Sequence, residues 1–279
     1  MHDFTEKLIE SKRRLVAGLP LQPGDPVEEG GCGVVGFASS VPVPGRSIFE
    51  ASIQMHNRGN GKGGGVAATG LLPEQLGVDA DTLRNDYLLQ VALLDPQAER
   101  EIEEKFIAPY LRIDHKEKVK THGDFRELGL EVRPPDVVRY FVRASDQGLS
   151  AFREEHDLGD APLRAVEDEY VYQNSFRLNQ SCYAALGDKK GFVMSHARDL
   201  MIFKIVGYAE NVVKYYGLQD LQANVWIAHQ RYPTKGRVWH PAGAHPFIGL
   251  NEALVHNGDF ANYFSITEYL RQQNVVPQF

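Results

Sequence analysis

Short apolar runs separated by polar, glycine-rich turns occupy most of the chain, and their length and periodicity predict a mixed α+β fold. The expected strands are residues 32–39, 66–72, 87–94, 111–120, 130–144, 191–196, 200–208, 225–228 and 253–255. The expected helices are residues 5–19, 47–57, 96–109, 146–156, 167–183, 209–216 and 265–273. We expect the strands at 191–196 and 200–208 to pair with each other about a turn at Ala197–Asp199.

Two stretches stand apart from this pattern. The first is the linker LPLQPGDPVEEGG, rich in Pro, Gly and Glu, which separates the N-terminal helix from Cys32 at the start of the next strand. The second is the middle region, residues 79–158, whose expected order of elements is βαββα. This order predicts a small insertion of a ferredoxin-like kind, with its charged residues on solvated faces and no chemistry of its own.

The composition narrows the classes of partner. The chain has 279 residues, of which 43% are apolar and 24% charged, and a net charge of -7 without a Lys/Arg-rich stripe argues against nucleic-acid binding as its main role. No apolar run approaches the roughly 20 residues of a membrane span, and the N-terminus lacks the apolar segment of a secretory signal. Two cysteines, Cys32 and Cys182, in so long a chain indicate a reducing compartment. We therefore expect a cytoplasmic protein without nucleic-acid or membrane partners.

Residues with useful chemistry concentrate in one stretch, residues 224–262, NVWIAHQRYPTKGRVWHPAGAHPFIGLNEALVHNGDFAN. It contains two short apolar runs, each followed by polar residues. The first run leads to His229 and Arg231, and the second leads to His256 and Asn257. Strands that end in polar groups at a common edge can line a pocket, and we expect these two ends to meet.

Three residue types in the chain suit acyl transfer. Cys32 is the candidate nucleophile, although only a few per cent of an unperturbed thiol with a pKa of about 8.5 is thiolate near pH 7, so it needs a base. The side chain of Asn257 and the backbone N–H of Gly258 could hold an oxyanion. The guanidinium fork of Arg231 matches a carboxylate. Together these residues point to acyl transfer from an amide that carries a carboxylate, such as glutamine.

Two other sites can be set aside on spacing and order. Gly59, Gly61 and Gly64 satisfy G-x-G-x-x-G, but here the glycines follow a helix and precede a strand, the reverse of a dinucleotide site. We interpret them as a tight turn that lets the backbone approach another element. Zinc binding by Cys32 with the histidines at 240 and 245 lacks the spacing of a zinc site, so no metal is expected.

Several segments together resemble the class II glutamine amidotransferases, which are N-terminal-nucleophile hydrolases. CGVVGF resembles the nucleophile strand of that family, HNRG its Arg-Gly segment, HQRYPT its H-x-R-[YF]-[SP]-T segment and HNGDFANY its HNG motif. WHPAGAHPF resembles the W-H-x-A-x-P-F element of the amidotransferase domain of glutamate synthase, which is the subgroup most similar to this chain. The resemblance extends from Cys32 to the end of the chain, with little contribution from the middle region.

The resemblance implies a catalytic centre of three residues. Cys32 would attack the side-chain amide of glutamine, and its own α-amino group, with a pKa of about 7.7–8.0, would be the general base. That amino group exists only if the preceding residues are removed. Asn257 and the N–H of Gly258 would hold the tetrahedral oxyanion, where the loss of one donor typically slows the reaction by about 10²–10³.

The resemblance also implies which residues bind the substrate. Arg231 would hold the α-carboxylate of glutamine, with Thr234 beside it. Arg58 and Gly59 would line the side of the pocket that carries the nucleophile. His240, from the WHPAGAHPF element, would be a further contact to the substrate.

For the fold, the resemblance implies an αββα sandwich of two antiparallel sheets between helical layers, with residues 79–158 as a small α/β insertion. Residues 1–31 would be an N-terminal arm or propeptide, and residues 32–279 the amidotransferase domain. The family's Thr/Ser-Asp-Thr/Ser-Glu segment has no counterpart before Phe279, so we expect either that the domain continues beyond it or that the pocket is completed elsewhere. Glutamate synthase subunits would receive the ammonia. FMN and iron–sulfur clusters would belong to those partners, because this chain has too few cysteines for clusters, and no cofactor is expected in it.

Several alternatives stay open at this point. His256 could be a base for Cys32, as in papain-like enzymes, although we interpret it as a packed residue that orients Asn257. Cys32 could be a small buried hydrophobe, which is our interpretation of Cys182. The amidotransferase could serve another acceptor, such as phosphoribosyl pyrophosphate or aspartate. The chain could also be a catalytically silent subunit that keeps the fold for assembly or glutamine sensing.

Overall fold

A computed structural model of the chain describes residues 31–183, 189–232, 240–258 and 262–275, together with four residues near the N-terminus, Lys7, Glu10, Ser11 and Arg14. The chain divides into two units, Met1–Gly30 and Gly31–Phe279. The four described residues of the first unit are all helical. Everything below concerns the second unit.

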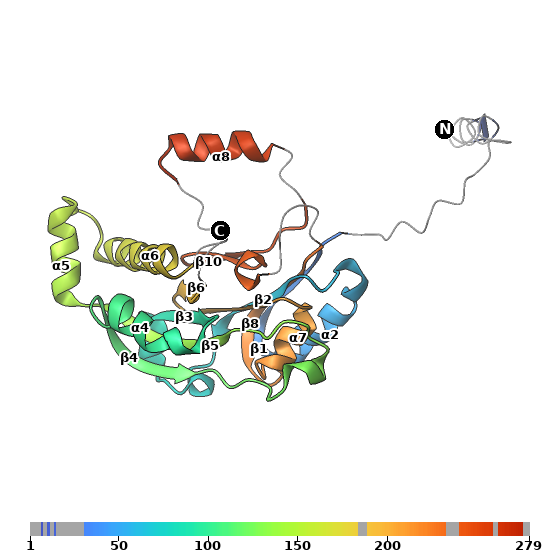
Figure 1. The fold of residues 1–279 in the computed structure, drawn as a ribbon, viewed down its shortest axis with the longest axis horizontal. Helices are drawn as coiled ribbons and strands as arrows, with labels where there is room; N and C mark the ends of the chain where they lie inside the picture. The colour runs from blue at the N-terminus through green and yellow to red at the C-terminus, as the bar shows by residue number, and fades with distance from the viewer. Residues whose placement is uncertain are drawn as a thin grey trace. The chain divides into compact units, whose positions relative to one another are not determined.

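Two four-stranded antiparallel sheets form the centre of this unit (Figure 1). The first sheet has the strand order β1 (Gly33–Pro44), β8 (Gln222–Gln230), β2 (Gly64–Leu71) and β7 (Leu200–Ile205). The second sheet has the order β4 (Leu111–Lys118), β5 (Asp136–Ala144), β3 (Tyr87–Leu93) and β6 (Gly191–Ala197). A separate hairpin pairs β9 (Phe247–Gly249) with β10 (Glu252–Leu254).

Helices complete the described part of the unit. The α-helices are α2 (Arg46–Ile53), α3 (Ala80–Asn85), α4 (Glu99–Ile102), α5 (Asp146–Glu155), α6 (Leu163–Cys182), α7 (Ala209–Tyr215) and α8 (Tyr263–Gln272). The shorter turns of 3-10 or π type are η1 (His56–Arg58), η2 (Pro73–Leu76), η3 (Pro96–Ala98), η4 (Glu103–Ile107), η5 (Phe125–Leu128) and η6 (Pro241–Gly243). No helix in the described ranges is both long enough and apolar enough to cross a membrane.

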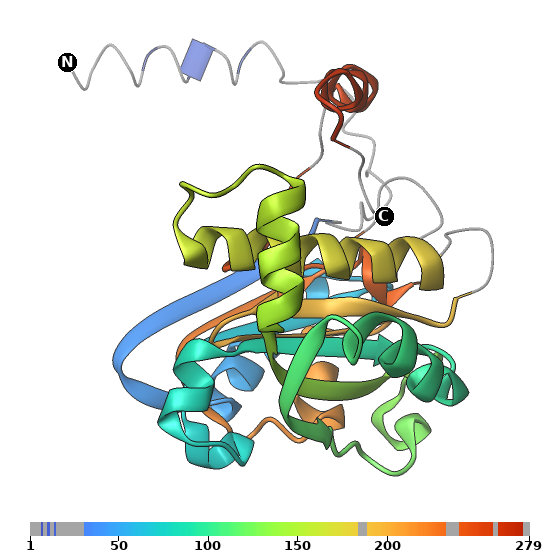
Figure 2. The ribbon, with the colours of Figure 1, turned by 90° about the vertical axis from the view of Figure 1, so that its left-hand side faces the viewer.

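The second sheet is buried on both faces, and this creates four layers. Phe141 and Phe192 point into a core shared with Ala67 and Ile202 of the first sheet. Their neighbours on the same strands, such as Tyr140, pack into a second core with α4 and α6. Helices α2 and α7 lie against the first sheet, and Figure 2 shows the long helix α6 running across the second. The expected αββα sandwich of two antiparallel sheets is therefore confirmed.

From β3 onward the middle region has the βαββα order that its sequence predicts, and the helix α3, which was not predicted, precedes it. Its three strands, β3, β4 and β5, form one continuous sheet with β6, because β3 pairs with β6 on one side and with β5 on the other. Strand β4 lies at the edge, where its residues alternate between covered and exposed. The region thus supplies three of the four strands of the second sheet.

The expected hairpin between residues 191–196 and 200–208 is wrong. Strand β6 is an edge of the second sheet and β7 is an edge of the first, so the turn between them carries the chain from one sheet to the other. Asp199 fixes this crossing in a left-handed conformation with φ of 48°. Its carboxylate accepts the backbone N–H groups of Gly70 and Leu71 at 3.1 and 2.8 Å, which ties the turn to the end of β2.

Candidate functional site

Cys32 lies at the head of β1, beside the end of β8. The register of these strands pairs Gly33 with Gln230, which brings the preceding residue next to the segment that follows β8. The backbone N–H of Tyr232 donates to the Sγ atom of Cys32 at 3.3 Å, and the same sulfur lies 3.8 Å from the carbonyl oxygen of Tyr232. The candidate nucleophile therefore contacts the HQRYPT segment directly.

Cys32 shares one face of the first sheet with His229 and Arg231. Side chains alternate along a strand, and Val34, two residues after the cysteine, is opposite His229. Gln230 points to the other face, where its side-chain amide donates to the carbonyl of Ser52 in α2. The cysteine, the histidine and the arginine therefore face away from the helices α2 and α7.

Both the backbone and the guanidinium of Arg231 are held by hydrogen bonds. Its backbone N–H donates to the carbonyl of Gly63 at 2.8 Å, and Nη1 of its guanidinium donates to the carbonyl of Gly243 at 2.6 Å. Burial lowers the pKa of Arg231 below its usual value, and the nearby sulfur of Cys32 opposes that shift. A half-buried cation therefore lies beside the candidate nucleophile.

The HNRG segment packs against both the cysteine and β8. A Cβ atom on Gly31 would lie 3.1 Å from Nη2 of Arg58, so this guanidinium covers the residue before Cys32. A Cβ atom on Gly59 would lie 3.0 Å from Cβ of Gln230, which leaves room for a glycine and little else. The structure thus places Arg58 and Gly59 beside the neighbours of Cys32, on the face of the sheet toward which Gln230 points.

Behind this segment lies a polar network that the sequence did not reveal. Gln230 donates to Glu210 Oε2 at 2.8 Å, and His56 Nδ1 donates to Oε1 of the same carboxylate at 2.6 Å. The ring of His56 also stacks on Tyr208 with 3.9 Å between ring centroids. The network fixes the start of HNRG against the end of β8. Its members lie far apart in sequence, so no local pattern could indicate it.

The two polar ends expected to meet do come together, although β8 and β10 belong to different sheets. Nε2 of His229 donates to the carbonyl of His256 at 3.0 Å. Burial lowers the pKa of His229 to about 4, so the ring is neutral near pH 7 and keeps the proton on Nε2 for this bond. The hydrogen bond connects the first sheet to the segment that carries Asn257 and Gly258.

Gly258 has a backbone that other residues rarely adopt. Its φ is 151°, and a Cβ atom there would lie 3.2 Å from the ring of His256. The ring of His256 therefore packs on Gly258, and its role in orienting Asn257 stays a prediction. Asn257 and Gly258 are both exposed. Within the described ranges no hydrogen bond joins Cys32 to either residue, so the oxyanion site stays a prediction.

His240 lies farther from the cysteine, at the start of η6. Its Nδ1 accepts the backbone N–H of Ala242 at 3.1 Å, and its ring packs on Tyr183 with 4.7 Å between centroids. Burial lowers its pKa to about 4, which keeps it neutral near pH 7. Its link to the site is indirect. It borders η6, and Gly243, the last residue of η6, accepts the hydrogen bond from Arg231. Thr234 lies outside the described residues.

A buried lysine also supports η6, and sequence reasoning missed it. Nζ of Lys204 donates to the carbonyl of Ala242 at 3.2 Å and lies 5.0 Å from the ring centroid of Phe247. Burial lowers the pKa of Lys204 to about 7. The signal was a single lysine inside the apolar run LMIFKIVGY. In the described part of the chain no group of three or more His, Cys, Asp or Glu residues is arranged to hold a metal ion.

Comparisons with known proteins bear on this arrangement. No family model matches the chain. It is 30% identical over 244 residues to an uncharacterized protein of Archaeoglobus fulgidus, an alignment that covers 86% of this chain and 56% of the relative. The chain thus spans just over half the length of that relative.

Shorter stretches match named enzymes. The chain is 37% identical over 87 residues to the isomerizing glutamine–fructose-6-phosphate aminotransferase of Helicobacter pylori, which covers 31% of this chain and 14% of the enzyme. It is 33% identical over 81 residues to the enzyme of that name from Pyrobaculum aerophilum, covering 28% of this chain and 13% of the enzyme. These partial similarities support a chain of the glutamine amidotransferase type.

Proposed function

We propose that this chain hydrolyses L-glutamine to glutamate and ammonia, with Cys32 as the nucleophile. One observation carries the proposal: the Sγ atom of Cys32 accepts the backbone N–H of Tyr232 and lies beside the half-buried guanidinium of Arg231. The candidate nucleophile thus lies beside a guanidinium that can hold the carboxylate of a substrate. The partial similarity to aminotransferases whose names include glutamine supports the choice of substrate.

The reaction begins when the α-amino group of Cys32, freed by removal of residues 1–31, accepts the proton of the thiol. The sulfur then attacks the amide carbon of glutamine and forms a C–S bond, while the carbonyl oxygen becomes an oxyanion. When this intermediate collapses, the C–N bond breaks, and the α-ammonium group returns its proton to the nitrogen that leaves as ammonia. Water then hydrolyses the thioester and releases glutamate. Effective general-base catalysis requires a base with a pKa near the working pH, which an α-amino group has.

Substrate binding rests on Arg231 in this proposal. The contact of Nη1 with Gly243 aims the guanidinium and leaves its other N–H groups for the α-carboxylate of glutamine, the geometry of a bidentate pair. Arg58 and Gly59 line the side of the nucleophile. Thr234 and His240 are the proposed further contacts, the latter acting from its place at the start of η6.

The proposed oxyanion site consists of the side chain of Asn257 and the backbone N–H of Gly258. His229 supports it through its hydrogen bond to the carbonyl of His256. The ring of His256 supports it by packing on Gly258. We assign both histidines to holding this segment and the α-amino group to the role of base.

For the destination of the ammonia, we propose the synthase subunits of a glutamate synthase, in the cytoplasm. FMN and the iron–sulfur clusters would then lie on those partners. The similarity to glutamine–fructose-6-phosphate aminotransferases favours a second candidate, an amidotransferase that serves a different acceptor. Release of glutamate that accelerates when synthase subunits with 2-oxoglutarate are added would support the first candidate. No acceleration by them would favour the second.

Two cysteine variants test the nucleophile. Cys32→Ala should abolish release of glutamate from glutamine. Cys182→Ala, which changes the buried cysteine of α6, should leave it nearly intact. Equal loss in both variants would refute the assignment. Wild-type protein that binds glutamine but does not cleave it, with residues 1–31 still attached, would instead identify a silent subunit.

A further inference from the structure

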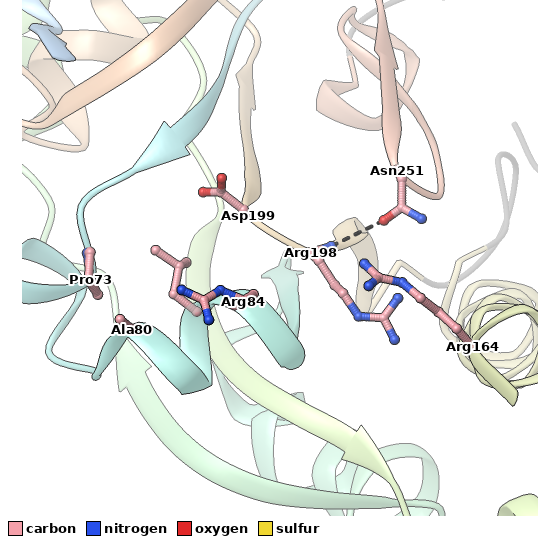
Figure 3. A pocket seen from close by; sticks show the side chains of 8 residues that line it. Pro73, Ala80, Arg84, Arg164, Arg198, Asp199 and Asn251 are labelled. Atoms are coloured by element: carbon pink, nitrogen blue, oxygen red, sulfur yellow. Dashed lines mark hydrogen bonds between the residues drawn. The ribbon is translucent and has the colours of Figure 1, made fainter. Parts of the chain in front are cut away.

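A pocket of about 460 Å³ lies at the other end of the first sheet from Cys32 (Figure 3). Its lining residues are Pro73, Ala80, Leu83, Arg84, Arg164, Arg198, Asp199 and Asn251. We call it the arginine pocket. At the end of the sheet near Cys32, Gly64 of β2 pairs with Gln230 of β8 and with Ile205 of β7. The pocket lies beyond the opposite end of β7, about 17 Å away along the strand at about 3.3 Å per residue.

Arg198 is part of the frame of the pocket rather than a free charge. Its guanidinium donates to Asp168 at 2.6 Å and to Glu167 at 2.7 Å, and it lies 3.9 Å from the centroid of the Tyr87 ring. Its backbone N–H donates to Oδ1 of Asn251 at 3.4 Å, which Figure 3 draws as a dashed line. Two carboxylates pair with this arginine, and only 7% of its side chain is exposed.

The carboxylate of Asp199 forms no ion pair with the arginines of the pocket among the described residues. Both of its carboxylate oxygens accept backbone N–H groups, one from Gly70 and one from Leu71. These bonds direct the carboxylate toward the end of β2. The acidic group in the lining is therefore already used for the crossing between the two sheets.

Arg84 and Arg164 bring two further guanidinium groups to the pocket. Arg84 lies in the last turn of α3 and Arg164 in the first turn of α6, and both are exposed. Neither has a hydrogen bond or an ion pair with any other residue that the structure describes. Two guanidinium groups from separate elements, neither of them in an ion pair with a described residue, thus line one pocket.

The start of α6 adds to this field. The helix begins at Leu163 after Pro162, without a side-chain N-cap and without an acidic residue in its first turn. Unpaired N–H groups at a helix start attract anions and disfavour cations. A cation such as Arg164 is therefore poorly placed for the stability of the helix itself, and an anion bound there would satisfy both the guanidinium and the helix start.

We propose that the arginine pocket binds a small phosphate ester. Its phosphate group would lie between Arg84 and Arg164, and its organic part would lie on the apolar side formed by Pro73, Ala80 and Leu83. Two forks from different elements suit a group with three terminal oxygens and nearly two negative charges, whereas a carboxylate is satisfied by one fork. The volume exceeds that of a phosphate ion and lies within the range of pockets for small molecules. This site is independent of the proposed reaction at Cys32.

Isothermal titration of the whole chain with ribose 5-phosphate, inorganic phosphate and ribose tests the proposal. We expect ribose 5-phosphate to bind more tightly than inorganic phosphate, and ribose not to bind. Arg84→Gln and Arg164→Gln should each weaken binding by about tenfold, as expected for the loss of one charge-assisted contact. Arg177→Gln removes an exposed arginine from the same helix, α6, outside the pocket lining, and should leave the affinity unchanged.

Three results would overturn the proposal. The first is the absence of binding of ribose 5-phosphate at millimolar concentration. The second is an equal loss in the Arg164→Gln and Arg177→Gln variants, which would show a general effect of net charge. The third is tighter binding of succinate than of the phosphate ester, which would reassign the pocket to carboxylates. Added NaCl should weaken the binding, because exposed charges are screened within about 10 Å at 0.1 M salt.

Discussion

Gly258 offers a sharp test of the proposed oxyanion site, through the substitution Gly258→Ala. The backbone of this residue has a φ of 151°, and an added Cβ atom would lie 3.2 Å from the ring of His256. Backbone conformations of this kind cost a residue other than glycine about 1–3 kcal/mol. Because the residue is exposed at a loop, we expect this free energy to act on the local arrangement of the segment, with little change in the melting temperature.

The expected effect on activity follows from that cost. A local penalty of about 2 kcal/mol reduces the competent arrangement by about thirtyfold, so glutamine hydrolysis should slow by a similar factor. Because the same segment would hold the oxyanion, the loss should appear mainly in kcat and less in KM. Steady-state release of glutamate measures both quantities.

Two further variants separate the causes. Gly249→Ala places a methyl group in the preceding hairpin, at a position where no atom lies within 4 Å, and it should leave the activity unchanged. The double variant His256→Ala with Gly258→Ala removes the contact with the ring but keeps the unfavourable φ, so it should recover little activity. Full activity in Gly258→Ala, or equal losses in Gly258→Ala and Gly249→Ala, would refute the assignment of this segment to the oxyanion.

Three other predictions concern stability, measured by chemical denaturation or thermal melting. Burial lowers the pKa of both His196 and His229 to about 4, below the value near 6.5 of the unfolded chain, so protonation favours unfolding. The free energy of unfolding should therefore be highest above about pH 6.5 and fall toward pH 4. The expected fall is up to about 1.4 kcal/mol per pH unit for each group. Equal stability at pH 7 and pH 5 would contradict this account. Lys204→Met removes a lysine whose pKa burial lowers to about 7, so it should raise the melting temperature at pH 7 by a few degrees. This gain should shrink as the pH approaches 10, where the lysine is neutral in the unfolded chain as well. A lower melting temperature of the variant at pH 7 would show that the hydrogen bond to Ala242 outweighs the cost of burial. Asp199→Ala should destabilise the chain by about 2–4 kcal/mol, since it removes two hydrogen bonds to a charged acceptor at a residue with positive φ. Asp199→Asn should destabilise it less. Unchanged stability of the alanine variant would show that the crossing between the sheets does not depend on this carboxylate.

The sequence predicted most of the elements because their apolar runs are long and regular. The failure at β6 and β7 has a clear physical cause. Both runs are buried throughout, so neither shows the alternation that would indicate which face is covered or which strand is the partner. A short turn between two strands then suggests a hairpin. Here the turn, which contains Arg198 and Asp199, instead leads the chain from the second sheet into the first.

The candidate site was predictable only in part. The segments HNRG and HQRYPT were identified by resemblance. The structure places Arg58 beside Gly31, and Gly59 beside Gln230. The supporting groups were not predictable, because Glu210 and Lys204 act on residues that are distant in sequence. The two exposed arginines of the arginine pocket also carry no local signal, since an exposed arginine on a helix is ordinary.

The most direct test of the central claim labels active protein with a glutamine analogue that carries an electrophile in place of the side-chain amide, followed by peptide mapping with mass spectrometry. The account predicts a single adduct on Cys32, with that cysteine as the first residue of the labelled chain and with protection by glutamine. An adduct on Cys182, or full activity in protein that keeps residues 1–31 and shows no label on Cys32, would contradict it.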